Sequence, residues 1–104
     1  MDKITVMNNI QLYAQKVRAE LQPAAIVLFG SYVNGEATDE SDIDVAVIME
    51  NFNGNHWDAS TKLWEFTYDI DDRIEPILLD SRNDKSGFVS EIMRTGQIIY
   101  VASH

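Results

Sequence analysis

The segment LFGSYVNGEATDESDIDVAVI, residues 28–48, decides the fold that this sequence predicts. It begins inside a short apolar run, Ala24–Phe29, which stops at a glycine, as a strand buried on both faces often does. The polar stretch Ser31–Glu40 follows, and DIDVAVIM then favours a second strand. Aspartate fits a half-buried strand poorly, so Asp42 and Asp44 need a physical reason to stand there.

The rest of the chain predicts helices and two more strands around this pair. Apolar residues recur every three or four positions before Pro23 and again after a polar loop, which is helical spacing. Pro76 places the third strand at an edge, or at a strand end. The order predicts a small sheet with helices packed on it, an α/β or α+β domain whose strand order the sequence does not reveal. The expected helices cover Ile4–Leu21, His56–Ile70 and Asp84–Thr95, and the further strands cover Arg73–Leu79 and Gln97–Val101.

Composition indicates one globular domain over residues 1–104. The hydrophobic share of 45% and the charged share of 24% are ordinary for such domains. No apolar run approaches the ~20 residues of a membrane span, and MDKITVMNNI lacks the layout of a signal peptide. We therefore expect a cytoplasmic protein without a membrane partner. The absence of cysteine excludes disulfides and thiolate metal sites.

The charge of the chain limits its partners. The formal net charge is -9, and the eight basic residues are scattered along the sequence. Such a surface repels a phosphate backbone, so we expect no duplex nucleic acid as partner. An anionic substrate would need divalent cations to mediate its contact with this protein.

The spacing of Asp42 and Asp44 puts both carboxylates on one side of a strand, because alternate residues share a face. Two carboxylates so close repel each other, which raises the free energy of ionising both. A hard cation such as Mg²⁺ removes this penalty, since it prefers carboxylate oxygen, water and phosphate as ligands. The alternative, a solvated strand face with nothing bound, stays open at this point.

Glu75 is a third carboxylate within an otherwise apolar strand, where it is costly unless paired, metal-bound or solvated. If this strand pairs beside DIDVAVIM, Glu75 completes a cluster with Asp42 and Asp44. Three carboxylates can hold two metals ~3.5–4 Å apart, as in displacement reactions at phosphorus. The alternative is an ion pair between Glu75 and Arg73.

Gly30 and Ser31 follow the first strand directly. Glycine lets the backbone turn sharply and approach a ligand, and the free N–H groups of a helix that begins at Ser31 would attract phosphate. A plain turn with a serine cap is the alternative. Competing motifs are missing, because the chain has no Gly-Lys-Ser/Thr and its acidic stretch lacks the central glycine of a calcium loop. Trp57 and Trp64, seven residues apart, suit a core or a partner interface better than base stacking.

These motifs together resemble the signature of the polymerase-β-type nucleotidyltransferases. The matching residues are Gly30-Ser31, ten further residues, then Asp42-Ile43-Asp44, and also RIEP and the closing EIMRTGQIIY. Within this superfamily the chain resembles the minimal nucleotidyltransferases, which are often antitoxins of helical HEPN-type toxins. The resemblance implies an α+β fold with a small mixed sheet of about four strands and flanking helices.

The resemblance also implies a reaction and its residues. It implies transfer of a nucleoside monophosphate, AMP from ATP, to a hydroxyl such as a tyrosine of the partner toxin. Gly30 and Ser31 would hold the triphosphate, Asp42 and Asp44 would bind two Mg²⁺ ions, and Glu75 would be the third carboxylate that activates the hydroxyl.

One departure from the family concerns charge in the glycine loop. Many relatives have basic residues there, as in Gly-Ser-Arg-Ala-Arg-Gly, where this chain has Tyr32 and Asn34. Asn34 can bind a phosphate but adds no charge. The alternative function is therefore an antitoxin that neutralises its partner by complex formation, with weak nucleotide use or none. Transfer to a small hydroxyl compound is less favoured in a chain this short, and a homo-oligomer stays open.

Overall fold

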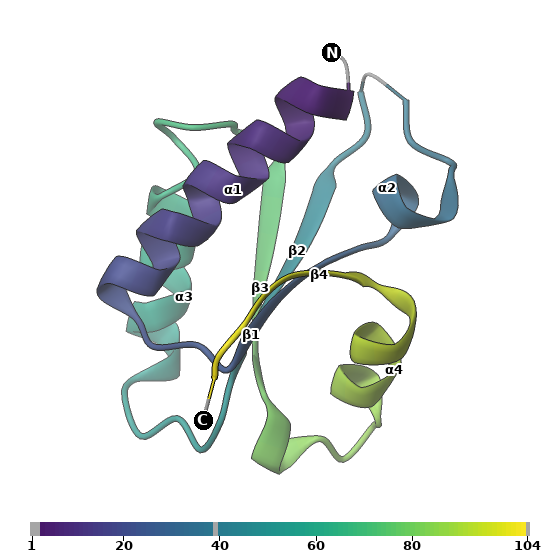
Figure 1. The fold of residues 1–104 in the computed structure, drawn as a ribbon. Coiled ribbons are helices and arrows are strands. Elements are labelled where there is room, and N and C mark those ends of the chain that lie inside the picture. Colours follow the sequence, from purple (N-terminus) through teal and green to yellow (C-terminus); the bar gives the residue numbers. More distant parts are fainter. Residues whose placement is uncertain (1–2, 39, 104) are drawn as a thin grey trace.

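The computed structural model describes residues 3–38 and 40–103 and forms a four-stranded sheet between helices (Figure 1). The longest helix presents one buried stripe to the sheet, and within the described residues no helix combines the length and apolar character needed to cross a membrane. The helices are α1 (Lys3–Glu20), α2 (Ser31–Asn34), α3 (His56–Glu65) and α4 (Phe88–Thr95), with a 3-10 turn η1 at Ser81–Asn83. The strands are β1 (Ala25–Phe29), β2 (Ile43–Met49), β3 (Ile74–Asp80) and β4 (Gln97–Val101).

The sheet has the strand order β3-β2-β1-β4 and is mixed. β1 pairs antiparallel with both β2 and β4, whereas β2 and β3 are parallel. A parallel pair needs a crossover connection, and α3 with its flanking loops supplies it here. The expected α+β fold with a small mixed sheet is thus confirmed. The position of β3 at an edge agrees with its proline, Pro76, which has no N–H to donate.

Helices cover the two faces of the sheet unequally. α1 and α3 lie on one face and α4 lies on the other, as Figure 1 shows. In β2, Val45 and Val47 join the core under α1 and α3, while Ala46 and Ile48 join the core under α4. α4 has only eight residues, so it covers only part of its face.

A buried hydrogen bond fastens the two helices of the larger layer together. Tyr13 of α1 is fully buried, and its hydroxyl donates to the carbonyl oxygen of Leu63 in α3 at 2.7 Å. Burial raises the pKa of Tyr13 far above its ordinary value, so the hydroxyl stays a donor at any physiological pH.

α3 differs from the expected helix in length and in orientation. It ends at Glu65 and not at Ile70, because a series of turns follows it. Ala59 and Leu63 face the core, whereas Trp57 and Trp64 face outward. Because α3 has apolar residues on two sides, either side could pack against the sheet. In the folded chain, the side with the smaller side chains does so.

Candidate active site

Three carboxylates meet where β2 begins. Asp44 of β2 lies directly opposite Glu75 in the parallel pair, and Asp42 immediately precedes β2. Opposed residues of neighbouring strands share a face of the sheet. That face is the one beneath α4, because the flanking Ile43 and Val45 belong to the core on the opposite side. β3 therefore does pair beside β2, and it brings Glu75 to the two aspartates.

The charges of the three carboxylates affect one another. Glu75 is an exposed residue, but the partial loss of water around its carboxyl and the neighbouring charges of Asp42 and Asp44 raise its pKa, and a hydrogen bond to Asp42 raises it further. Burial, and then the charge of Asp42, raises the pKa of Asp44. An ion pair with Arg73, the alternative that the sequence left open, would lower the pKa of Glu75. Such a pair therefore does not account for the raised pKa of Glu75. Arg73 pairs with Asp71 instead.

The donor atoms of this cluster suit a hard cation, since all are carboxylate oxygens. Their arrangement is a different matter. Across residues 3–38 and 40–103, no three His, Cys, Asp or Glu side chains are grouped so as to hold a metal ion. The chemistry of the donors fits Mg²⁺, while a ready-made ligand cage is not formed.

Gly30 brings the glycine loop into direct contact with this cluster. Its backbone has φ 78° and ψ −147°, a conformation that essentially only glycine adopts. A Cβ atom placed on Gly30 would overlap the Oδ2 atom of Asp44. Ser31 then begins α2, whose first N–H groups have no partner within the helix. The turn, the first helical N–H groups and the carboxylates therefore lie side by side.

Asn34 is turned toward its own loop. With its amide oriented to satisfy both ends, Nδ2 donates to the carbonyl oxygens of Gly30 and Ser31 at 3.0 and 3.2 Å. The backbone N–H of Asn34 also donates to the carbonyl of Gly30, at 3.2 Å. The side chain thus fixes the shape of the loop and does not extend outward as a phosphate ligand would.

The sequence reasoning missed a charged cluster that ties the glycine loop to the start of β3. The Arg73 guanidinium donates to both carboxylate oxygens of Asp71, at 3.1 and 2.9 Å, and to the hydroxyl of Tyr32 at 3.3 Å. Asp71 also accepts from Asn9 of α1 at 3.1 Å. The one sequence signal for it is Asp-x-Arg at a strand start, where the Arg73 N–H donates to Asp71.

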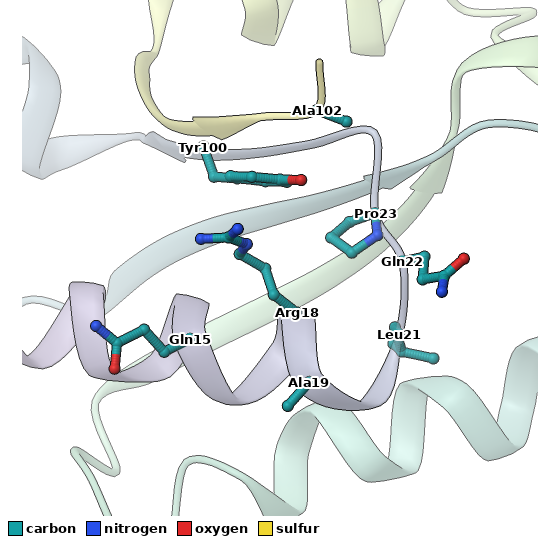
Figure 2. A pocket seen from close by; sticks show the side chains of 8 residues that line it. All are labelled: Gln15, Arg18, Ala19, Leu21, Gln22, Pro23, Tyr100 and Ala102. Atoms are coloured by element: carbon teal, nitrogen blue, oxygen red, sulfur yellow. The ribbon is translucent and has the colours of Figure 1, made fainter. Parts of the chain in front are cut away.

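A separate hollow of about 520 Å³ lies far from the carboxylates (Figure 2). It is lined by the end of α1, the α1–β1 link and the end of β4, so it lies where β1 begins, whereas Gly30 follows the other end of β1. The guanidinium of Arg18 stacks on the ring of Tyr100 at 4.0 Å, as the two side chains facing each other in Figure 2 show. This hollow belongs to the packing of α1 and not to the candidate active site.

Comparison of the sequence with known proteins gives two matches. The family described as "Polymerase beta, Nucleotidyltransferase" matches residues 8–104. A protein of Methanocaldococcus jannaschii named "Putative protein adenylyltransferase MJ1305" is 33% identical over 89 residues, which are 80% of this chain. The chain spans 60% of the length of this curated relative.

Comparison of the structure gives relatives of the same fold. A crystal structure described as "a putative nucleotidyltransferase from Sulfolobus solfataricus" superposes with a TM-score of 0.71 at 19% identity, over 94% of this chain and 82% of that chain. A structure described as "the toxin-antitoxin with AMP-PNP" superposes with a TM-score of 0.60 at 24% identity, over 89% of this chain and 74% of that chain.

Proposed function

The chain belongs to the polymerase beta nucleotidyltransferase family, and on that premise we propose that it transfers AMP from ATP to a hydroxyl of a partner protein. The proposed acceptor is a tyrosine of a helical HEPN-type toxin, which would make this protein an antitoxin. The observation that carries the proposal is the strand register, which sets Glu75 opposite Asp44 and near Asp42, while Asp44 itself lies against Gly30. The names of the relatives, a protein adenylyltransferase and a toxin-antitoxin with the ATP analogue AMP-PNP, support it.

The proposed reaction is a displacement at the α-phosphorus of ATP. The acceptor oxygen forms a bond to this phosphorus, the bond to the bridging oxygen of the β-phosphate breaks, and pyrophosphate leaves. The acceptor proton passes to a carboxylate of the cluster. Glu75 suits this role, because its exposed carboxylate lies on an edge strand directly opposite Asp44, where an acceptor can reach it. Ser31 and the first N–H groups of α2 would hold the triphosphate next to the cluster.

Mg²⁺ is the proposed cofactor, held by Asp42, Asp44 and Glu75. When bound, two such ions neutralise phosphate charge and stabilise the attacking and leaving oxygens. Their binding is measurable without catalysis, by calorimetric titration of the protein with MgCl₂ in the presence of AMP-PNP. We expect Asp42→Asn and Asp44→Asn to weaken binding of the ion. Equal binding by wild type and both variants would contradict this ligand set.

The transfer itself is tested with ATP labelled in the α-phosphate, Mg²⁺ and the purified product of the adjacent gene. We expect label on that product, and at least ~100-fold slower labelling by Glu75→Gln, since a positioned acid–base group contributes about that much. We expect a similar loss in Asp44→Asn, which removes a charge from the proposed ion site. Glu20→Gln is the matched control, an exposed carboxylate at the far end of α1. Labelling by Asp44→Asn at the wild-type rate would contradict the proposal.

A second candidate function is neutralisation by complex formation alone. It is favoured by Asn34, which satisfies the carbonyls of its own loop and brings no charge to a triphosphate. In that case the double variant Asp42→Asn with Asp44→Asn would neutralise the partner as well as wild type does. If AMP transfer is the mechanism, the same double variant loses neutralisation although it still folds.

A further inference from the structure

Three large aromatic side chains lie on the outer surface of α3 and of the turn that follows it. Trp57 is 79% exposed, Tyr68 73% and Trp64 42%. We call these three residues the aromatic stripe. Trp57 and Trp64 share a helix face because they are two turns apart. The sequence left two interpretations of the tryptophans open, a place in the core and a place in a partner interface. Their exposure excludes the core.

The segment that carries the aromatic stripe is acidic, and one of its carboxylates borders the stripe. The stripe lines a groove of about 820 Å³, which Glu65 also lines. Over the segment 56–72, the exposed charged side chains are four carboxylates and one lysine, namely Asp58, Glu65, Asp69, Asp72 and Lys62. Of these, Asp69 has Lys16 of α1 within 3.7 Å.

We propose that the aromatic stripe is the surface on which a partner protein docks, and that the partner presents lysine or arginine side chains to it. Exposed aromatic rings close together are the usual anchors of protein interfaces. Cations bind over the faces of Trp and Tyr rings, and here they would also meet the carboxylates of this segment. The proposal rests on the proposed function, since it locates the partner which that function requires.

A second copy of this chain suits the stripe less well. In a two-fold symmetric dimer the same surface meets itself, so a surface with four exposed carboxylates and one lysine would meet another of the same negative charge. Each copy also carries a net charge of -9. Like charges brought together across an interface oppose association. Charge complementarity therefore selects a basic partner of another sequence.

The position of the aromatic stripe allows the partner that docks there to supply the acceptor hydroxyl as well. α3 packs on β3, which is an edge of the sheet and carries Glu75. The carboxylate cluster lies on the face of the sheet opposite α3. A partner bound on α3 leaves the carboxylate cluster accessible to ATP. The partner can reach the cluster around the edge strand β3. Docking and chemistry are thus separate, and variants can test each alone.

Binding to the aromatic stripe has a direct readout, because Trp57 and Trp64 are the two tryptophans of the sequence. The full chain is labelled with 5-fluorotryptophan and titrated with the purified product of the adjacent gene. We expect both ¹⁹F signals to shift on binding. Calorimetry of Trp57→Ala and Trp64→Ala should show the Kd raised at least roughly 30-fold, the size of an interface hot spot.

Two controls separate the stripe from general surface effects. Leu12→Ala on α1 and Ile98→Ala on β4 remove side chains that are 52% and 48% exposed, and we expect their Kd to stay within about threefold of wild type, as contacts outside an interface do. Glu65→Lys, which reverses one border charge, should weaken binding more than Glu65→Gln does.

The outcomes distinguish this proposal from the proposed function. If the Trp variants bind like wild type and still transfer AMP, the docking surface is wrong and the function stands. If the Trp variants lose binding and wild type transfers no label, the surface stands and the transfer is wrong. If wild type does not bind the partner, both are overturned. A dimer of the chain alone in sedimentation, made monomeric by Trp57→Ala, would show that a second copy occupies the stripe.

Discussion

Residue 30 must be a glycine because of the side chain that lies against it. Most exposed turn glycines can be replaced at a modest cost in stability, but the space where a Cβ of residue 30 would go is filled by the Asp44 carboxylate. With any other residue, either Asp44 or the loop would have to move. The cost would then fall on catalysis as well as on folding.

Gly35 offers a comparison, because its φ is also positive, at 81°, but its ψ of 13° is open to other residues and a Cβ added there meets nothing within 4 Å. We expect Gly35→Ala to lower the free energy of unfolding by about 1 kcal/mol, the cost of a left-handed backbone, with activity retained. Gly30→Ala should lower the transfer rate at least ~100-fold, as a displacement near 1 Å does. The labelled-ATP assay and urea unfolding measure the two effects.

Retention of wild-type activity by Gly30→Ala would contradict the link between the glycine loop and Asp44. Equal losses of activity in both glycine variants would attribute the effect to backbone strain and not to the displaced carboxylate.

At the scale of elements, the start of β3 depends on an ion pair with little exposure to water. The Asp71 side chain is 4% exposed and that of Arg73 17%. Through Tyr32 and Asn9, this pair connects β3 to the glycine loop and to α1. It therefore helps to hold Glu75, two residues beyond Arg73, in its register with β2.

Asp71→Asn should lower the free energy of unfolding by about 2 kcal/mol at pH 7, because it removes the charged acceptor of two hydrogen bonds from the Arg73 guanidinium. The hydrogen bonds from Arg73 hold the pKa of Asp71 below its ordinary value. A carboxyl with a lowered folded pKa stabilises the fold above its unfolded pKa, about 3.9, and loses this contribution as the pH falls through the folded pKa. The difference between wild type and variant should thus be full at pH 7 and shrink below about pH 4.

Urea unfolding of both proteins at pH 7, 5 and 3 checks this expectation. Asp69→Asn, whose side chain is largely exposed, is the control and should change stability by less than about 1 kcal/mol. A wild-type advantage that grows as the pH falls would contradict the assigned role of Asp71.

Most of the helices and strands can be predicted from the sequence, but which of them pack or pair with one another cannot. Buried apolar runs and helical spacing gave four strands and three of the helices, since those patterns reflect local geometry. The parallel pairing of Asp44 with Glu75 depends on a crossover, which no local pattern encodes. The outward orientation of Trp57 was also unpredictable, because both sides of α3 carry apolar residues and only the packed sheet selects one.

The sequence predicts that three carboxylates lie together, but not the contacts that hold them. The spacing of Asp42 and Asp44 and the costly position of Glu75 predict this cluster, and its part in catalysis stays a prediction. The contacts that hold the cluster in place come from residues far apart in sequence, such as Asn9 and Asp71. Single-sequence patterns do not show contacts of that range.

For the molecule as a whole, stability should be highest in the centre of the sheet. β1 and β2 have neighbours on both sides and are almost fully buried, whereas β4 is an edge that exposes Ile98 and Val101. Amides of a buried centre exchange only when the protein unfolds globally, while edges open locally. We expect the slowest hydrogen exchange at Val27 and Val47 and clearly faster exchange in the last residues of β4. Equal protection of β1 and β4 in native-state exchange would contradict this.

The crossover between β2 and β3 also determines when, during synthesis of the chain, the three carboxylates of the site come together. On a ribosome, Gly30 and both aspartates emerge first and can pair as an antiparallel hairpin of β1 and β2. Glu75 emerges only after the whole of α3, and it reaches Asp44 only when β3 docks. Under the proposed chemistry a nascent chain is therefore inert until its third strand is in place, so activity itself reports that synthesis has passed β3 and that the sheet is built.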